Sequence, residues 1–255
     1  MKKKFCTIIT IAFMALLLLS VGAINCVSAQ ADERISWSEV VPPTVDGAWT
    51  SDDEWTDGGD VTTIGEDVSF TSTWFYGDAV VTEWLVEFLS DTTDDAADYV
   101  EFCMDGGDLV GGTAPQADDF KFVITGHTDL VWYQGDGSGW TEVSLDETEI
   151  EWANALSTSP TDSTEHWILE FVIPKNVGTV QLGVTWYLRL AVYDADTQSL
   201  AVWPEGSDAD VPDTWGLENY TSETIPEGFS FGVMVLLSSV AVVVAAVGLR
   251  KRLRD

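Results

Sequence analysis

Cysteine, histidine and basic residues are scarce in this chain of 255 residues, and each scarcity excludes a class of protein. Three residues are cysteine, and two of them fall in the N-terminal export segment described below, so Cys103 is the one cysteine of the mature chain. A single cysteine forms no internal disulfide, which excludes a small disulfide-stapled scaffold. Because its neighbours Phe102 and Met104 are apolar, we expect Cys103 to be buried.

The shortage of basic residues is most marked in the central part of the chain. Between residues 30 and 228 there are four basic and 42 acidic side chains, which gives this part a formal charge of about −38. Such a field repels nucleic acid and anionic polymers and attracts cations, so nucleic-acid binding is excluded. Two explanations remain open for the acidity: solubility in salty surroundings, where repulsion is screened, or binding of divalent cations.

Catalytic motifs are also missing. The two histidines, His127 and His166, form no metal motif, and the Ser-Gly pairs lack the frame of a nucleophile elbow. Pairs of carboxylates are too common in this chain to mark a catalytic acid and base. We therefore expect a protein that is not an enzyme.

The N-terminal residues 1–29 follow the plan of a secretory signal peptide. A basic start, Lys2–Lys4, precedes the apolar stretch Ile8–Val21, and the small residues of Val27–Ala29 come at the positions that a signal peptidase reads. The apolar stretch is short and is followed by this cleavage site, so we expect a cleaved signal peptide rather than a membrane anchor.

The C-terminal end predicts one transmembrane helix. Phe229–Leu249 is 21 residues without a charge, enough to cross the roughly 30 Å apolar core of a bilayer. The basic tail 250–255 follows at once, and positive charge stays in the cytoplasm. We therefore expect a single-pass protein at the cell surface, with its C-terminus in the cytoplasm and a short stalk, 221–228, that keeps the external domain close to the membrane.

A second reading of this tail stays open. The order Ile225-Pro226-Glu227, apolar span and basic cluster resembles the C-terminal sorting signals of archaeal surface proteins, which are cut and exchanged for a lipid. In this chain Gly228 separates the Pro-Glu pair from the first aromatic residue, which departs from that pattern. The helix is thus predicted to be either retained or replaced by a lipid.

The external part has the pattern of strands. Short segments rich in β-branched and aromatic residues alternate with Gly/Asp turns, and no segment keeps a 3.6-residue period over ten residues. We therefore predict an all-β fold, one antiparallel β-sandwich over residues 35–220. The predicted strands are Thr71–Phe75, Val80–Leu89, Tyr99–Met104, Phe120–Thr125, Leu130–Tyr133, Trp167–Ile173 and Trp186–Tyr193. Near the end of this domain, Asn219-Tyr220-Thr221 is an N-glycosylation triplet, which suggests an exposed loop with Asn219 as the acceptor.

Five short motifs follow one another along residues 42–220. They are Thr44–Trp49 with Asp53–Trp55, the strand Tyr99–Asp105, the acidic pair in Ala117–Phe120, Glu170–Lys175, and Trp203–Pro204 with Pro212–Gly216. Together these motifs resemble the family 9 carbohydrate-binding modules and their relatives. That resemblance implies a β-sandwich but leaves the ligand open, because the superfamily includes sugar binders and b-type haem subunits.

The tryptophans favour carbohydrate as the ligand. Twelve occur between Trp37 and Trp215, and sugar rings stack on indole faces. Trp74, Trp203 and Trp215 lie near predicted loops or strand ends, and we predict that they form the stacking platform. The charge favours a neutral or cationic sugar over an acidic one.

A calcium site is a separate hypothesis. Asp105, Asp108, Asp118 and Asp119 flank one loop, and a hard cation requires several oxygens at one point. The alternative is that these four acids are solvent-exposed turn residues that bind no ion.

Two other functions remain alternatives. A b-type haem would need axial ligands, which Met104 supplies together with one of Lys121, Lys175, His127 or His166. A structural or interaction protein of the cell envelope, such as a surface-layer component, is favoured by the short stalk.

Overall fold

The computed structural model describes residues 32–38, 42–55, 58–76, 80–106, 111–144, 150–177, 180–181 and 183–221. The predicted signal peptide, the stalk beyond Thr221, the span Phe229–Leu249 and the basic tail all lie outside these residues. Among the residues described, no helix has the length and apolar character needed to cross a membrane.

Strands make up most of the described chain. Helix is limited there to α2 (Asp52–Trp55) and a 3-10 turn, η1 (Pro212–Thr214). The all-β prediction is confirmed. The strands are β1 (Glu33–Ser38), β2 (Thr62–Ile64), β3 (Val68–Tyr76), β4 (Val80–Phe88), β5 (Tyr99–Asp105), β6 (Asp119–Thr125), β7 (Asp129–Gly135), β8 (Trp140–Val143), β9 (Glu151–Ser157), β10 (His166–Pro174), β11 (Asn176–Val177), β12 (Val180–Gln181), β13 (Thr185–Asp194), β14 (Ser199–Trp203) and β15 (Gly216–Thr221).

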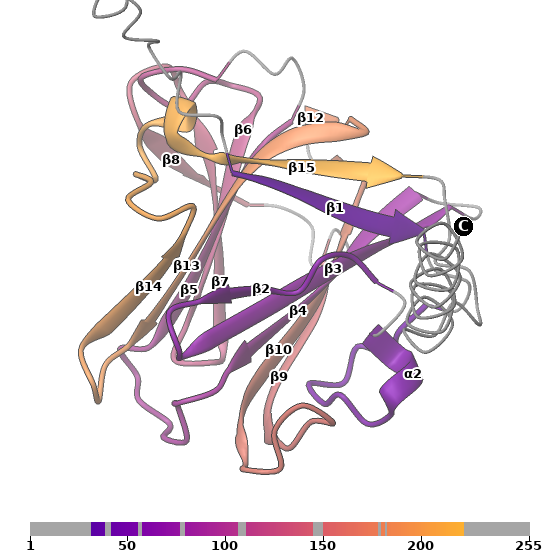
Figure 1. The fold of residues 1–255 in the computed structure, drawn as a ribbon. Coiled ribbons are helices and arrows are strands. Elements are labelled where there is room, and N and C mark those ends of the chain that lie inside the picture. Colours follow the sequence, from indigo (N-terminus) through magenta and orange to yellow (C-terminus); the bar gives the residue numbers. More distant parts are fainter. Residues whose placement is uncertain are drawn as a thin grey trace, which may run out of the picture. The chain divides into compact units, whose positions relative to one another are not determined.

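Thirteen of these strands form one continuous sheet in the order β8-β7-β6-β5-β13-β15-β1-β3-β4-β10-β9, with β14 on β13 and β2 on β3. The sheet curls, so that the half from β8 to β13 faces the half from β3 to β9, and β15 and β1 join the two halves (Figure 1). The short strands β11 and β12 pair separately. The result is a β-sandwich whose two layers are halves of one sheet.

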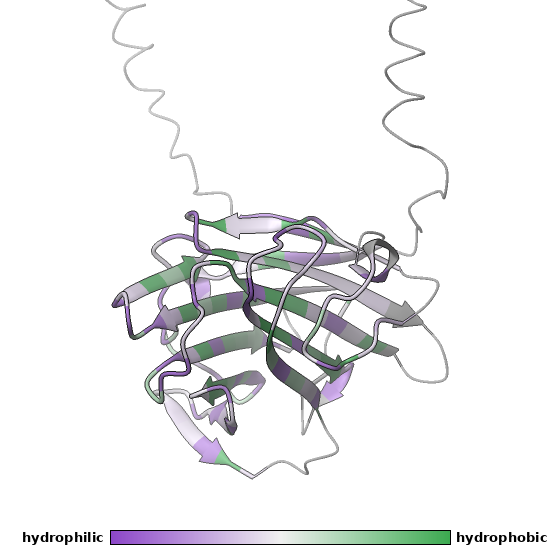
Figure 2. Cartoon of the chain, turned by 90° about the horizontal axis from the view of Figure 1, so that it is seen from below, coloured by the Kyte–Doolittle hydropathy of each residue, from purple (hydrophilic) through white to green (hydrophobic). Residues whose placement is uncertain are grey.

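Aromatic side chains fill the space between the two layers. Along the strands, apolar and polar residues alternate, which places one set inside (Figure 2). The Trp84 ring of β4 lies 4.9 Å from the Phe102 ring of β5 and 6.0 Å from the Phe171 ring of β10, all three fully buried. Cys103 is buried and free, as expected, and Met104, the proposed haem ligand, belongs to the same core.

The sandwich is not purely antiparallel, which corrects one part of the prediction. Strand β1 runs parallel to both of its neighbours, with Arg34 opposite Glu218 of β15 and Trp37 opposite Thr73 of β3. No hairpin joins β1 to either neighbour, so no tight turn requires the antiparallel direction.

Asn219 lies in strand β15 rather than in a loop, which corrects a second expectation. The strand is flanked by β1 and β13, and Asn219 is half-buried. Its Nδ2 donates to Glu33 Oε1 at 2.7 Å, and its Oδ1 accepts from Thr185 Oγ1 at 2.7 Å. Glycosylation at Asn219 stays a prediction.

Candidate functional site

A cleft of about 250 Å³ opens beside the first strands of the β3–β4 layer. Three kinds of group meet in it: an indole, hydroxyls and carboxylates. Its wall is built from the loop that carries Trp49, from strands β2, β3 and β4, and from the turn between β9 and β10. The lining residues are Trp49, Val61, Thr63, Ser69, Phe70, Thr71, Leu85, Glu87, Leu89, Thr161 and Asp162.

Glu87 is the polar centre of this wall. Its Oε2 accepts from Ser69 Oγ at 2.8 Å, and its Oε1 accepts from Thr161 Oγ1 at 3.0 Å. The Nε2 of His166 lies 3.3 Å from the same Oε1, while the Nδ1 of His166 lies 2.8 Å from the carbonyl oxygen of Thr164. A ring with acceptors at both nitrogens is satisfied when it carries both protons, so the geometry describes an imidazolium paired with a carboxylate.

The electrostatics of the wall agree with that geometry. Burial disfavours charge on both groups, yet the hydrogen bond from His166 and those from neighbouring hydroxyls lower the pKa of Glu87 below its ordinary value. Burial likewise opposes the charged form of His166, but the hydrogen bond to Glu87 raises the pKa of His166. At the rim, hydrogen bonds from Thr164 lower the pKa of Asp162. The cleft therefore presents carboxylate acceptors near neutral pH.

The three tryptophans predicted to form a stacking platform are buried. Trp74 is 9% exposed, Trp203 8% and Trp215 1%. The Nε1 of Trp74 donates to Thr221 O at 2.7 Å, and that of Trp215 donates to Asp208 O at 2.9 Å. Because their ring faces are covered by protein, the expectation that they offer an open platform is not met. The indole that lines the cleft belongs to Trp49, which is itself a core residue and 6% exposed.

Trp203 shows how that expectation failed. Its ring packs edge-on against Phe70 at 5.7 Å and lies over the Cα of Gly216, where a Cβ would overlap it. The sequence predicted an accessible Trp203 because this residue lies near a predicted loop or strand end. The residues that cover it come from two other strands: Phe70 from β3, far away in the chain, and Gly216 from the start of β15.

The acids predicted to bind calcium are only partly described. Asp105 and Asp119 face each other across the β5–β6 ladder and are both 2% exposed, and Asp118 is half-buried. Asp108 lies outside the described residues. Convergence of the four on one ion stays a prediction.

Two of the five motifs that resemble a known family contact each other in the fold: Thr44–Trp49 with Asp53–Trp55, and Glu170–Lys175. Glu170 of β10 accepts three hydrogen bonds through its carboxylate: Oε2 from the backbone nitrogens of Asp46, at 2.9 Å, and Gly47, at 2.8 Å, and Oε1 from Trp55 Nε1, at 3.0 Å. Burial raises the pKa of Glu170 to about 7, and the three N–H donors oppose that rise. Gly47 has φ +79°, and a Cβ there would lie 2.8 Å from Ala155 N, so the motif requires glycine. These three hydrogen bonds to Glu170, the Glu170 latch, fix the loop that carries Trp49.

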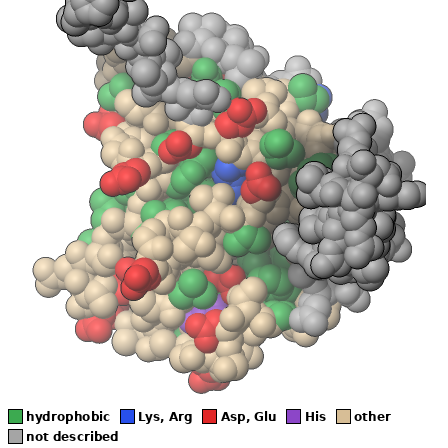
Figure 3. All heavy atoms as spheres, in the orientation of Figure 1, with side chains coloured by type: hydrophobic (Ala, Val, Ile, Leu, Met, Phe, Trp, Pro, Cys, Tyr) green, Lys and Arg blue, Asp and Glu red, His purple; other side chains and the backbone are tan. Residues whose placement is uncertain are grey.

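The surface around these features is acidic. Figure 3 shows acidic side chains spread over the face seen in Figure 1, with little lysine or arginine among them. Two of the four basic residues of the domain, Lys121 and Arg189, contact one carboxylate, that of Glu101, at 3.2 and 2.5 Å. A third, Arg34, is buried against Glu218. Little positive charge is left to attract an anionic ligand.

Comparisons with known proteins give similar folds and no family assignment. No family model matches the sequence, and no curated protein matches it. A family 9 carbohydrate-binding module from Caldicellulosiruptor kristjanssonii, solved in complex with cellotriose, is 13% identical with a TM-score of 0.49, and the match covers 78% of this chain and 99% of that one. A protein from Bacteroides uniformis ATCC 8492, described as carbohydrate-binding, is 14% identical with a TM-score of 0.44, covering 75% and 100%.

Proposed function

We propose that this chain is a carbohydrate-binding module that is exported, held at the cell surface by the span Phe229–Leu249, and binds a neutral or cationic sugar in the cleft beside β3 and β4. The observation that carries the proposal is the composition of the cleft. The Trp49 indole, hydroxyls and two carboxylates line a space of about 250 Å³, which suits a saccharide unit with apolar ring faces and several hydroxyl donors.

The polar groups are also positioned before any ligand arrives. Glu87 is fixed by Ser69, Thr161 and His166, so a sugar hydroxyl would meet an oriented acceptor at a small entropic cost. The motifs that resemble family 9 modules support the same function. The charge of the domain supports a preference against uronates and sulfated chains.

The test uses an exposed residue of the cleft, because Trp49 and Phe70 belong to the core. Val61 is 64% exposed and lines the cleft, so Val61→Trp would fill part of it without disturbing the interior. Val184 is 68% exposed and does not line the cleft, so Val184→Trp is the matched control. The full-length chain is screened on a glycan array, and the best neutral ligand is measured by calorimetry.

We expect Val61→Trp to weaken binding at least about 10-fold, a loss on the scale of about 1.4 kcal/mol, while Val184→Trp binds as the wild type does. Equal binding by both variants would place the sugar elsewhere on the domain. A chain that binds no glycan on the array would overturn the proposed function.

A further inference from the structure

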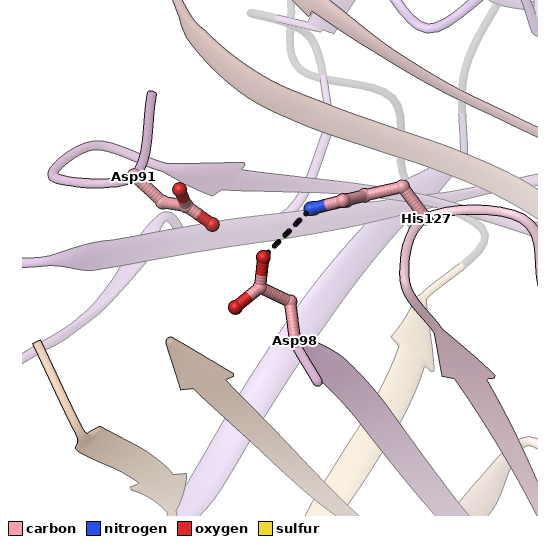
Figure 4. A group of neighbouring side chains, drawn as sticks. All are labelled: Asp91, Asp98 and His127. Carbon is pink, nitrogen blue, oxygen red and sulfur yellow. Dashed lines mark hydrogen bonds and ion pairs between the residues drawn. The ribbon is translucent and has the colours of Figure 1, made fainter. Parts of the chain in front are cut away.

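Two carboxylates and one imidazole, none of which lines the cleft, meet at another place in the sandwich. Asp91 follows β4, Asp98 directly precedes β5, and His127 lies in the turn between β6 and β7. One ligand atom from each lies within 4.8 Å of the other two, and the residues are 4%, 3% and 9% exposed. Figure 4 shows the three side chains pointing toward one another. Among the residues described, these three side chains are close enough together to bind one ion.

The hydrogen bonds around His127 fix the position of its proton. The Nδ2 of Asn154 donates to Ile168 O at 2.8 Å, so the Oδ1 of Asn154 is the atom that faces His127 Nδ1, at 2.6 Å. That nitrogen must therefore donate, and in the neutral ring Nε2 carries only a lone pair. Yet Nε2 lies 3.2 Å from Asp98 Oδ2, which is also an acceptor. Two acceptors at this distance repel each other unless a proton or another cation lies between them.

Asp91 adds a second carboxylate. Its Oδ1 accepts from the backbone nitrogen and the hydroxyl of Thr93, at 3.0 and 3.2 Å, whereas its Oδ2 takes no hydrogen bond within the described part of the chain. Asp98 is held by the backbone nitrogens of Ala195, at 2.8 Å, and Asp95, at 3.1 Å. Neither carboxylate forms an ion pair with lysine or arginine in the described ranges. The buried charge there lacks a cation other than His127.

We propose that Asp91, Asp98 and His127 bind one divalent ion of the zinc or manganese class. An imidazole ligand favours these ions over calcium and magnesium, which prefer oxygen alone. Bonds of about 2.1 Å in a tetrahedral site set ligand atoms roughly 3.4 Å apart, and the observed distance between Nε2 and Oδ2 is 3.2 Å. Water would complete the coordination.

The surroundings of His127 are those of a metal ligand. Its other nitrogen donates to an amide oxygen, the outer contact that orients ligating histidines. Its face stacks on Trp167 of β10, with ring centroids 3.8 Å apart and planes within 9°. The ion would join the loop after β4, in one layer, to the β6–β7 turn in the other. Its role is therefore to tie the two layers together.

The test is a titration of the metal-stripped full-length chain with Zn²⁺, Mn²⁺ and Ca²⁺ in 0.5 M NaCl, roughly where the Debye length falls to a few ångströms and the acidic surface is screened. Wild type is compared with Asp91→Asn and His127→Gln. Asp129→Asn is the control, since Asp129 is exposed and lies two residues from His127. We expect one tight equivalent of Zn²⁺ or Mn²⁺, weak Ca²⁺ binding, an affinity reduced at least about 10-fold in both ligand variants, and no change in the control.

Thermal unfolding separates a ligand from a merely structural residue. Without metal, Asp91→Asn should be at least as stable as the wild type, because it removes one of two facing carboxylates, and with Zn²⁺ it should lose the rise in Tm that the wild type shows. A destabilised Asp91→Asn that still responds to Zn²⁺ would overturn the proposal. So would an imidazole ¹⁵N spectrum in which His127 stays doubly protonated and unchanged when Zn²⁺ is added.

Discussion

Arg34 and Glu218 form a buried ion pair across the parallel strands β1 and β15, with Arg34 Nε 3.3 Å from Glu218 Oε2 and both side chains at most 2% exposed. Burial lowers the pKa of Arg34 and raises that of Glu218, while each opposes the shift of the other. The guanidinium also lies 4.1 Å from the centre of the Phe70 ring and donates to Asp60 O at 2.7 Å. The pair therefore lies where the two layers join.

Removing one residue of the Arg34–Glu218 pair should lower the free energy of unfolding much more than replacing both residues. Glu218→Ala leaves a buried guanidinium without its counter-charge, and we expect a loss of about 3–5 kcal/mol in the free energy of unfolding. Arg34→Met combined with Glu218→Leu should lose less than Glu218→Ala alone. Urea unfolding of the single and double variants measures the coupling. Equal and additive losses would show that the charges do not interact.

The latch at Glu170 makes a second prediction. Glu170→Ala leaves the backbone nitrogens of Asp46 and Gly47 and the indole of Trp55 without their acceptor. Each orphaned donor costs roughly 1–3 kcal/mol, so we expect about 3 kcal/mol in total after partial solvation. Glu151→Ala on the neighbouring strand removes an exposed acid and serves as the control. A loss no larger than that of the control would remove the latch as a stabilising feature.

The pair of Glu87 and His166 predicts a pH range in which it stabilises the folded domain most. The pKa of Glu87 is lowered from 4.5. Its contribution to the free energy of unfolding is therefore present above pH 4.5 and is lost as the pH falls through the folded-state pKa. The pKa of His166 is raised from 6.5. Its contribution to the free energy of unfolding is therefore fully present below pH 6.5 and is lost as the pH rises through the folded-state pKa. The difference in unfolding free energy between wild type and His166→Gln should therefore be largest from pH 4.5 to 6.5. A difference that grows above pH 7 would contradict this pairing.

The contact between Gly216 and Trp203 gives a fourth prediction. A Cβ on Gly216 would overlap the Trp203 ring and lie 2.9 Å from Asp32 O, so Gly216→Ala must displace the ring or the strand. We expect a loss of about 1–3 kcal/mol, the usual cost of overpacking a core. A Cβ on Gly139 meets nothing within 4 Å, so Gly139→Ala should be close to neutral. Equal stability of Gly216→Ala and Gly139→Ala would mean that β15 shifts at this position without a measurable cost in stability.

Strands with an apolar, aromatic pattern could be predicted from the sequence, and each of the seven segments named lies within or overlaps an observed strand. Strands β1 and β15 could not. Their inward positions hold Arg34, Ser36 and Glu218, which satisfy one another only after the strands are paired. In the local sequence these inward polar residues break the alternation that identifies a strand.

The site was harder to predict than the fold. Whether a tryptophan is open depends on what covers it, and Trp203 is covered by Phe70 and Gly216, which no local pattern connects to it. Asp91, Asp98 and His127 match no metal motif, because two separate connections between strands bring them together. In a chain with 43 acidic residues, spacing alone does not single out two of them.

The order of the strands in the sheet also determines when the domain can fold. Strand β1 is synthesised first, yet one of its two ladders is made with β15, the last strand, more than 180 residues later. The two layers cannot be joined until residue 221 is available, so native closure follows synthesis of the whole domain rather than accompanying it. Pairing of such distant segments is slow, and until it occurs the edges of β1 and β13 that will pair with β15 stay open to chaperones or to other chains.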